Sequence, residues 1–501
     1  MAKAIMIQGT CSNAGKSLFA AALCRVFRED GYRVAPFKSQ NMALNSAVTP
    51  DGLEIGRAQA MQAEAAGIAP DVRMNPILLK PNSDTGSQLV LCGKPVGDYS
   101  AIEYQKKKKG LLSEVLKAYH SLAAEQDILV IEGAGSPAEI NLRADDIVNM
   151  GLAEAVDAPV ILIGDIDRGG VFAALYGTVK LLSEAEQARI KGLVINKFRG
   201  DIKILEPGLR QIEALTEKPV LGVLPYRHFD LEDEDSLSER LRKTKAEAEA
   251  LLRIAVIRLP RLSNFTDFDP LQAAPDVALN YVNSPAEIGA ADLLILPGSK
   301  STLDDLAWLK AQGFDTCIRD FAASGRPVLG ICGGYQMLGE TLRDKERGVE
   351  AAGLGLLPVD TVFYAAKQTV CASGTITASS GFWAALAGQK TEGYEIHMGQ
   401  SRIGKEADCF QRLSAREDSE RQRADGCVAG AVCGSYLHGL FDEVGVTETL
   451  LKALAARKGL SYSHRLKSRR ERQEAGFRLL SQTLREHFDL RGLYRIMGVE
   501  R

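Results

Sequence analysis

Short apolar runs alternate with helix-length segments along most of this 501-residue chain. Apolar runs of about five residues are typical of strands that helices cover on both faces, as in a parallel sheet. In the first half of the chain the predicted strands are 4–8, 32–36, 128–131, 160–163, 192–196 and 220–224. Between several of them lie helix-length segments such as 16–30 and 171–182. The alternation therefore predicts an α/β fold with a parallel sheet.

The alternation is interrupted once, by an acidic run at 231–236 and a charged stretch that continues to residue 249. It restarts with predicted strands at 253–259, 293–296 and 327–331, followed by a glycine-punctuated, β-rich stretch from 353 to 437. A shift in composition of this kind marks a domain boundary. We predict two α/β domains, residues 1–231 and 251–445, joined by a linker at 232–250.

Residues 446–501 form a basic, helical C-terminal segment in this interpretation. One apolar stripe recurs at helical spacing along it, made of Phe477, Leu480, Leu484 and Phe488. We expect the stripe to pack against the second domain. The alternative is that this helix is a docking surface for an anionic partner.

The composition restricts the class of protein. The 61 basic and 64 acidic residues nearly cancel, which argues against a dedicated nucleic-acid binder. No run of 18 apolar residues predicts a membrane span, and the first glycine loop begins too early to leave room for a signal peptide. The nine cysteines include no CxxC pair, which favours reduced thiols. We therefore expect a cytoplasmic protein that binds neither membrane nor nucleic acid.

A glycine-rich loop, Gly9–Ser17, follows the first predicted strand and opens the first predicted helix. Backbone N–H groups at a helix N-terminus bind phosphate oxygens, and in a P-loop the Lys-Ser pair contacts the β- and γ-phosphates and Mg²⁺. Five residues separate the two glycines here, where the standard loop has four. We predict an ATP site that includes Thr10, Asn13, Ala14, Gly15, Lys16 and Ser17.

Polar residues at other strand ends extend this site. Glu132 follows the run 128–131, and a carboxylate there suits Mg²⁺, so we predict that it binds the metal together with Ser17. Asp145–Asp146 are either helix caps or groups that contact metal or substrate. Asn196 and Lys197 end another strand, and they either contact the nucleotide base or lie in a plain turn.

A cysteine flanked by glycines, Cys332, follows the predicted strand 327–331 and precedes a helical segment. A nucleophile on such a sharp turn needs small neighbours, and its position at a helix N-terminus favours the thiolate. We predict that Cys332 is a nucleophile and that the backbone N–H of Gly333 binds the oxyanion formed from its substrate. Gly298, at the end of a neighbouring strand, is the predicted second oxyanion donor.

A thiol nucleophile needs a base, and the chain contains six histidines. His438 follows an apolar strand in the same half of the chain as Cys332, and its imidazole is suited to proton transfer near pH 7. His397, within Gly393–Gly399, is the competing candidate.

These two sites resemble known families. The first half resembles the dethiobiotin-synthetase and MinD-like class of P-loop proteins, and the second resembles class I glutamine amidotransferases. Their combination in this order resembles the cobyrinate-amidating synthetases, over about residues 1–445. Within that family, four strings resemble the branch that acts on the a,c-diamide: 36–46, 54–60, 75–81 and 165–172.

The resemblance implies an ATP- and glutamine-dependent amidoligase in cobalamin biosynthesis. It implies amidation of the b, d, e and g carboxylates of adenosylcobyrinic acid a,c-diamide, with Cys332 as the glutaminase nucleophile and His438 as its base. For the corrinoid polycarboxylate we predict contacts from Lys38, Gln40, Asn41, Asp146 and Arg168, with Lys80 as a further candidate. Two alternatives remain at this stage: the a,c-diamide synthase that acts earlier, and a MinD- or ParA-like ATPase switch. Self-association is also left open.

One departure from the wider amidotransferase pattern concerns the base. The usual His-x-Glu motif is His438-Gly439-Leu440 in this chain, so the carboxylate that orients the imidazole is missing from it. Glu395, close to His397 in sequence, is the candidate that the sequence offers in its place.

Overall fold

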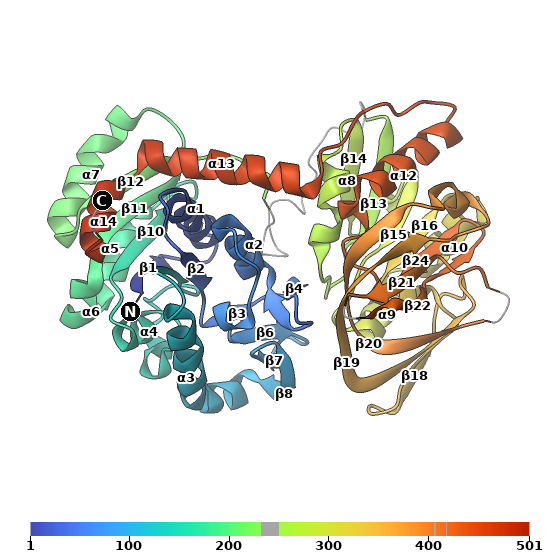
Figure 1. Ribbon diagram of the computed structural model, residues 1–501, viewed down its shortest axis with the longest axis horizontal. Helices are drawn as coiled ribbons and strands as arrows, with labels where there is room; N and C mark the ends of the chain where they lie inside the picture. The colour runs from blue at the N-terminus through green and yellow to red at the C-terminus, as the bar shows by residue number, and fades with distance from the viewer. Residues whose placement is uncertain (1, 232–249, 405–406, 417, 500–501) are drawn as a thin grey trace. The chain divides into compact units, whose positions relative to one another are not determined.

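The computed structural model describes residues 2–231, 250–404, 407–416 and 418–499 (Figure 1). The predicted linker at 232–250 lies, except for Ala250, outside these residues. The chain divides into two compact units. The first unit comprises Met1–Met42, Glu54–Leu231 and Arg472–Arg501, and the second comprises Ala43–Leu53 and Glu232–Glu471. Neither unit is therefore a single stretch of the sequence.

A six-stranded parallel sheet forms the centre of the first unit. Its strands are β1 (Lys3–Gly9), β2 (Val34–Phe37), β9 (Ile128–Glu132), β10 (Val160–Asp165), β11 (Ile190–Phe198) and β12 (Val220–Pro225). They lie in the order β12-β11-β10-β1-β9-β2, and every neighbouring pair is parallel. Each strand overlaps one of the six apolar runs predicted from the sequence, although β2 begins two residues after the start of the run 32–36. The expected α/β fold with a parallel sheet is confirmed.

Helices and a smaller sheet complete the first unit. The helices before residue 231 are α1 (Lys16–Glu29), α2 (Arg57–Ala66), α3 (Ala101–Ala123), α4 (Met150–Ala155), α5 (Val171–Leu181), α6 (Glu184–Arg189) and α7 (Ile202–Thr216). The smaller sheet consists of β3 (Gln40–Met42), β6 (Ile77–Pro81), β7 (Gly86–Leu91) and β8 (Lys94–Ser100), in that order. Strand β5 (Glu54–Gly56) precedes α2. The smaller sheet was not anticipated from the sequence.

The last two helices, α13 (Arg469–His487) and α14 (Leu490–Met497), bring the C-terminal part of the chain to the first unit. The apolar stripe of α13 joins the core that α1 forms over the parallel sheet. Phe488, which follows α13, packs its ring edge-on against Phe19 at 5.3 Å between centroids. Figure 1 shows α13, in red, beside α1. The expectation that the stripe packs against the second domain is therefore wrong.

Charge also favours this position of the basic helix. Arg25 of α1 donates two hydrogen bonds to the Glu474 carboxylate, at 2.9 and 2.7 Å. Arg485 pairs with Glu29 and Asp30 at the end of α1. An amphipathic pattern identifies the face that a helix buries but not its partner, and ion pairs of both polarities join the tail to α1 and to Asp30 at its end.

The second unit is also built on a six-stranded sheet. Its strands are β13 (Leu252–Ile257), β14 (Val277–Val282), β15 (Leu293–Leu296), β16 (Val328–Ile331), β23 (Cys427–Ala429) and β24 (Val432–Ser435). Their order is β14-β13-β15-β16-β24-β23, parallel except for the antiparallel pair β23–β24. The three strands predicted between 253 and 331 lie in this sheet.

The β-rich stretch forms a second sheet in this unit. It contains β17 (Thr341–Asp344), β18 (Val349–Ala352), β19 (Val359–Ile376), β20 (Lys390–Ile403), β21 (Gln411–Ala415) and β22 (Asp418–Asp425). The helices are α8 (Asp269–Ala273), α9 (Thr302–Ala311), α10 (Phe314–Ala323), α11 (Gly333–Leu338) and α12 (Val444–Arg457). The short strand β4 (Ser46–Val48) also belongs to the second unit, although it comes from the first half of the sequence. Every helix in the described part of the chain is too short or too polar to cross a bilayer.

The packing of α13 makes a prediction about stability. Leu484 is 2% exposed and Leu479, on the same helix, is 36% exposed. Leu484→Ala should destabilise the first unit by about 2–5 kcal/mol, because it removes buried methyl groups from the core, whereas Leu479→Ala should cost under about 1 kcal/mol. Both tryptophans, Trp308 and Trp383, lie in the second unit. Denaturation of Leu484→Ala should therefore move the circular dichroism transition and leave the tryptophan emission transition in place. A shift confined to tryptophan emission would place the helix on the second unit.

Candidate active sites

The glycine-rich loop joins β1 to α1 at the carboxyl edge of the first sheet. Gly15 caps α1 with φ of 97°, and a side chain there would collide with Asn196, whose amide lies 2.0 Å from the position of a Cβ. The Lys16 ammonium folds back over the loop and donates to the carbonyls of Cys11 and Gly135, at 2.9 and 3.1 Å. The loop thus leads directly into the N-terminus of α1, with its lysine held across the turn by backbone oxygens.

Two side chains near the end of β11 brace this loop. The Asn196 amide donates to the Ala14 carbonyl at 2.9 Å. The Lys197 ammonium donates to the Asn13 carbonyl and pairs with Asp165, both at 2.8 Å. The backbone N–H of Thr10 is held by the Ile163 carbonyl. Asn196 and Lys197 therefore support the loop directly, and sequence reasoning missed the contribution of Asp165.

Glu132 lies at the end of β9 and is 1% exposed. Its Oε1 accepts hydrogen bonds from Ser17 Oγ and from the Lys38 ammonium, both at 2.8 Å, and its Oε2 accepts one from Gln62 at 2.6 Å. Burial raises the pKa of this carboxyl, but the Lys38 charge and the three hydrogen bonds outweigh that effect and lower it. Glu132 is therefore held as a carboxylate beside the Ser17 hydroxyl.

The Ser17–Glu132 pair fits Mg²⁺, because hydroxyl and carboxylate oxygens are ligands that this ion prefers. Within the described residues no cluster of three or more His, Cys, Asp or Glu side chains could hold a metal by itself. A magnesium ion at this pair would therefore take its remaining ligands from phosphate and water, as in nucleotide sites.

The residues predicted to contact the corrinoid occupy varied environments. Lys38 is buried against Glu132, and Lys80 forms a buried ion pair with Glu54 at 2.6 Å. Gln40 accepts a hydrogen bond from the Tyr104 hydroxyl, and the buried Asn41 leaves its amide nitrogen without a partner. The guanidinium of Arg168 is exposed, 3.9 Å from Asp165.

Asp146 has the role of a cap. Its carboxylate accepts backbone hydrogen bonds from Val148, Asn149 and Gly151, at 2.8, 2.9 and 3.1 Å. These residues lead into α4, so of the two interpretations left open by the sequence the capping one agrees with the contacts of this side chain.

In the second unit, Cys332 lies on a strained turn between β16 and α11, with φ of 51°. Its glycine neighbours are required sterically, since a Cβ at Gly334 would lie 2.0 Å from the Leu296 carbonyl oxygen. A Cβ on Gly333 would lie 2.8 Å from the backbone nitrogen of Ser299, the residue after Gly298. The loop that contains Gly298 therefore adjoins the predicted oxyanion donor Gly333.

His438 reaches this thiol from the strand next to β16. Ile331 and Ser435 are paired in register on β16 and β24, so the residues that follow each strand emerge together. Two backbone hydrogen bonds with Tyr394, at 3.2 and 2.8 Å, fix the His438 main chain. Cys332 contributes to the raised pKa of this imidazole, and the Cys332 thiol itself donates to the Ile396 carbonyl at 3.7 Å. The structure thus brings His438 to the nucleophile.

The carboxylate that orients this imidazole is Asp267, which sequence reasoning missed. Its Oδ2 lies 2.6 Å from His438 Nδ1, and its Oδ1 accepts the Gly439 backbone N–H at 3.0 Å. Burial lowers the pKa of His438, but the Asp267 charge and hydrogen bond, followed by the interactions with Cys332, raise it to about 10. The imidazole is therefore protonated at neutral pH, and Cys332 interacts with an imidazolium.

The two other candidates have different partners. Glu395 pairs with Arg423 and accepts a hydrogen bond from Gln368, so it does not orient the base. His397 bonds through Nδ1 to the Gly399 carbonyl at 2.7 Å and stacks on Tyr436. Burial lowers its pKa to about 4. The contacts favour His438 over His397 as the partner of Cys332.

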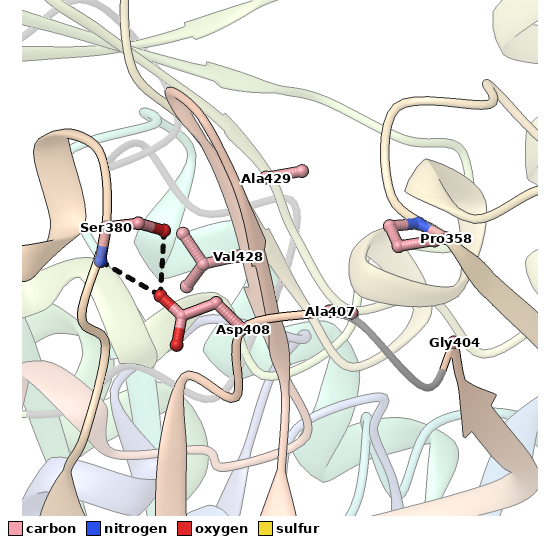
Figure 2. Close-up of a pocket in the computed structure, with 7 residues that line it drawn as sticks. All are labelled: Pro358, Ser380, Gly404, Ala407, Asp408, Val428 and Ala429. Atoms are coloured by element: carbon pink, nitrogen blue, oxygen red, sulfur yellow. Dashed lines mark hydrogen bonds between the residues drawn. The ribbon is translucent and has the colours of Figure 1, made fainter.

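The second unit also contains an open hollow of about 630 Å³ beside β23 (Figure 2). Asp408 at its edge accepts hydrogen bonds from the backbone and hydroxyl of Ser380, drawn as dashed lines. Neither Cys332 nor His438 lines this hollow, and its polar group is already satisfied by the turn that it holds.

Comparison with known proteins identifies both halves of the chain. Residues 5–236 match the model of the CobQ/CobB/MinD/ParA nucleotide binding domain, and residues 253–446 match that of the CobB/CobQ-like glutamine amidotransferase domain. A cobyric acid synthase of Ruminiclostridium cellulolyticum is 53% identical to this chain, and the match covers 100% of this chain and 98% of that protein. The cobyric acid synthase of Photorhabdus laumondii is 52% identical, over 100% of this chain and 99% of that protein. The one of Yersinia enterocolitica is 53% identical, over 98% of both chains.

The Asp267–His438 pair makes a prediction about glutamine hydrolysis. Asp267→Asn removes the charge that raises the His438 pKa and holds its tautomer, so kcat should fall roughly 10³- to 10⁴-fold. The alkaline limb of the kcat/KM profile, expected near pH 10 in the wild type, should move to lower pH because the imidazolium then loses its proton earlier. The measurement is glutamate release as a function of pH.

Asp276→Asn is the matched control for this variant. Asp276 also lies 2.6 Å from a histidine, His464, but both side chains are substantially exposed and lie outside the thiol site. The control should keep the wild-type rate and profile. An Asp267→Asn enzyme with a wild-type profile would show that this carboxylate does not orient the base.

Proposed function

The chain belongs to the cobyric acid synthase family, and we propose from this premise that its P-loop unit activates corrinoid carboxylates while its thiol unit supplies the ammonia that amidates them. The family membership makes it an ATP-dependent, glutamine-hydrolysing amidoligase of cobalamin biosynthesis. The proposed substrate is adenosylcobyrinic acid a,c-diamide, amidated at its b, d, e and g carboxylates.

The observation that carries the proposal is the Cys332–His438–Asp267 arrangement in a chain that also has a P-loop. A thiol beside an imidazolium, itself paired with a buried carboxylate, is an activated nucleophile for acyl transfer. An ATPase switch of the MinD type has no use for such a group.

Glutamine hydrolysis follows from these contacts. The Cys332 thiolate attacks the carboxamide carbon, and the negative charge on the carbonyl oxygen develops beside the backbone N–H of Gly333 and the loop of Gly298. The imidazolium of His438 gives its proton to the departing nitrogen, which leaves as NH₃ and leaves a thioester behind. Water then attacks the thioester with His438 as base, which releases glutamate and restores the thiolate and the imidazolium.

Amidation requires a carboxylate to become an electrophile. The carboxylate oxygen attacks the γ-phosphorus of ATP, ADP leaves, and NH₃ displaces phosphate from the acyl phosphate to form the amide. We propose that Lys16 contacts the transferred phosphoryl group and that Ser17 and Glu132 hold Mg²⁺. When bound, this ion neutralises charge on the phosphates.

Lys38 has a proposed role that differs from the substrate contact expected from the sequence. Its ammonium neutralises Glu132 in the absence of a bound cation. A metal ion at Glu132 would replace that positive charge, which makes Lys38 a group that keeps the carboxylate ionised and in place between turnovers.

Substitution of Cys332 tests whether glutamine hydrolysis and amidation of the corrinoid take place at separate sites. Cys332→Ala should abolish glutamine-supported amidation, because no other group can form the thioester, while amidation with ammonium salts should remain measurable. The readout is mass spectrometry of the corrinoid, which loses about one mass unit for each hydroxyl replaced by an amine. Cys317→Ala, at a cysteine outside the thiol site, is the control. Equal loss of both activities would contradict separate sites.

The phosphate loop is tested by Lys16→Ala. The variant should lose amidation with either nitrogen source, since Lys16 stabilises charge on the transferring phosphoryl group, and it should retain basal glutamine hydrolysis. Lys203→Ala, at an exposed position on α7, should behave as the wild type. Unchanged amidation by Lys16→Ala would overturn the assignment of the P-loop.

A further inference from the structure

Residues 43–53 come from the first half of the sequence but belong to the second unit. We refer to them as the strap. They follow β3, and they contain β4 and a turn in which Thr49 and Leu53 are hydrogen-bonded to each other. Asn45 and Ser46 are 1% and 0% exposed, so this part of the strap is built into the core of the unit.

Three hydrogen bonds attach these two residues to the thiol site. The Asn45 side-chain oxygen accepts the backbone N–H of Phe265 at 3.2 Å. The Ser46 backbone N–H donates to Asn264 Oδ1 at 3.1 Å, and the Ser46 carbonyl accepts the Tyr394 hydroxyl at 3.2 Å. The strap therefore holds two side chains, those of Asn264 and Tyr394, and the backbone two residues before Asp267.

Asn264 and Tyr394 are both in contact with the His438 imidazole. The Tyr394 ring is stacked on it, with centroids 5.2 Å apart and an interplanar angle of 18°. The Asn264 amide nitrogen lies 3.5 and 3.4 Å from the two ring nitrogens. Asn264 holds this position with φ of 52°, a left-handed conformation that asparagine tolerates better than most residues.

These contacts restrict the rotation of the His438 ring, which the hydrogen bond to Asp267 alone does not fix. A single hydrogen bond at Nδ1 fixes one atom of the ring, but the ring can still turn about that bond, which would move Nε2 relative to Cys332. A stacked phenol ring and an amide against the nitrogens fix the plane as well. Because proton transfer depends on distance and alignment, a misplacement of about 1 Å can cost about 100-fold in rate.

We propose that the strap is a positioning element of the glutaminase, in which Asn45 and Ser46 hold Asn264 and Tyr394 against the His438 imidazole so that glutamine hydrolysis depends on residues from the P-loop half of the sequence. The proposal rests on the assignment of glutaminase activity to Cys332 and His438. It adds that this site is incomplete without Asn45 and Ser46.

The decisive variant is Tyr394→Phe in the full-length chain. It keeps the ring stacked on His438 and removes the hydroxyl that bonds to the Ser46 carbonyl. We expect kcat for glutamine hydrolysis to fall about tenfold or more, with KM for glutamine within about twofold, because the variant disturbs proton transfer rather than binding. The kcat of Tyr394→Leu, which also lacks the stacked ring, should fall further. Asn45→Ala should reproduce the effect of Tyr394→Phe without any change at the ring.

Asp51→Ala is the matched control, since Asp51 is an exposed residue in the turn of the same segment. It should keep the wild-type kcat and KM. Thermal unfolding of every variant separates positioning from folding, because a strap that only stabilised the unit would lower the melting temperature while the folded fraction kept its kcat.

The outcomes separate this proposal from the one on which it rests. Wild-type enzyme that releases glutamate, and Cys332→Ala enzyme that does not, would support the glutaminase assignment whatever the strap variants do. If Tyr394→Phe and Asn45→Ala then hydrolyse glutamine at the wild-type kcat, the positioning role of the strap is wrong. A fall in kcat matched by an equal rise in KM, or by an equal loss of folded protein, would also overturn it.

Discussion

Both units depend on the same property of parallel sheets, that loops at the carboxyl ends of adjacent strands converge. In the first unit this edge gathers the P-loop after β1, Glu132 at the end of β9, Asp165 at the end of β10 and Asn196 near the end of β11. In the second unit it gathers the Cys332 turn after β16 and the His438 segment after β24. Residues that lie more than a hundred positions apart thus reach each other because their strands are paired in register.

Pairing of buried charge is the second feature common to both units. Lys38 with Glu132, Lys80 with Glu54 and His438 with Asp267 are each almost fully buried. An unpaired charge at such depth would change its protonation state or destabilise the fold by several kcal/mol. In the thiol site the pairing also has a chemical consequence, because Asp267 keeps a proton on His438 that the departing nitrogen needs. The same electrostatic requirement therefore stabilises the unit and prepares the proton donor.

Local patterns in the sequence predicted the strands, the P-loop and the cysteine turn, because each depends on residues that are adjacent in the chain. Asp267 was not predicted, since its partner His438 lies 171 positions away and nothing in Ser263–Phe268 marks a catalytic carboxylate. Glu395 was preferred for its position in the sequence, whereas the structure pairs it with Arg423. The stripe on α13 was recognised, but its partner was not, because amphipathicity describes one surface only. Lys38 was expected at a substrate for its charge, and burial against Glu132 is a tertiary effect.

The composition of the first unit from three stretches of chain has a consequence for its synthesis. Domains generally fold as units while the chain emerges from the ribosome, the N-terminal part first. Here the core around α1 includes Phe477, Leu484 and Tyr494, which are translated after the whole amidotransferase domain. The nascent P-loop unit therefore keeps an apolar face of α1 uncovered until residues 472–501 have been synthesised. The glutaminase has no such delay, because the segment that it borrows is translated before the rest of it.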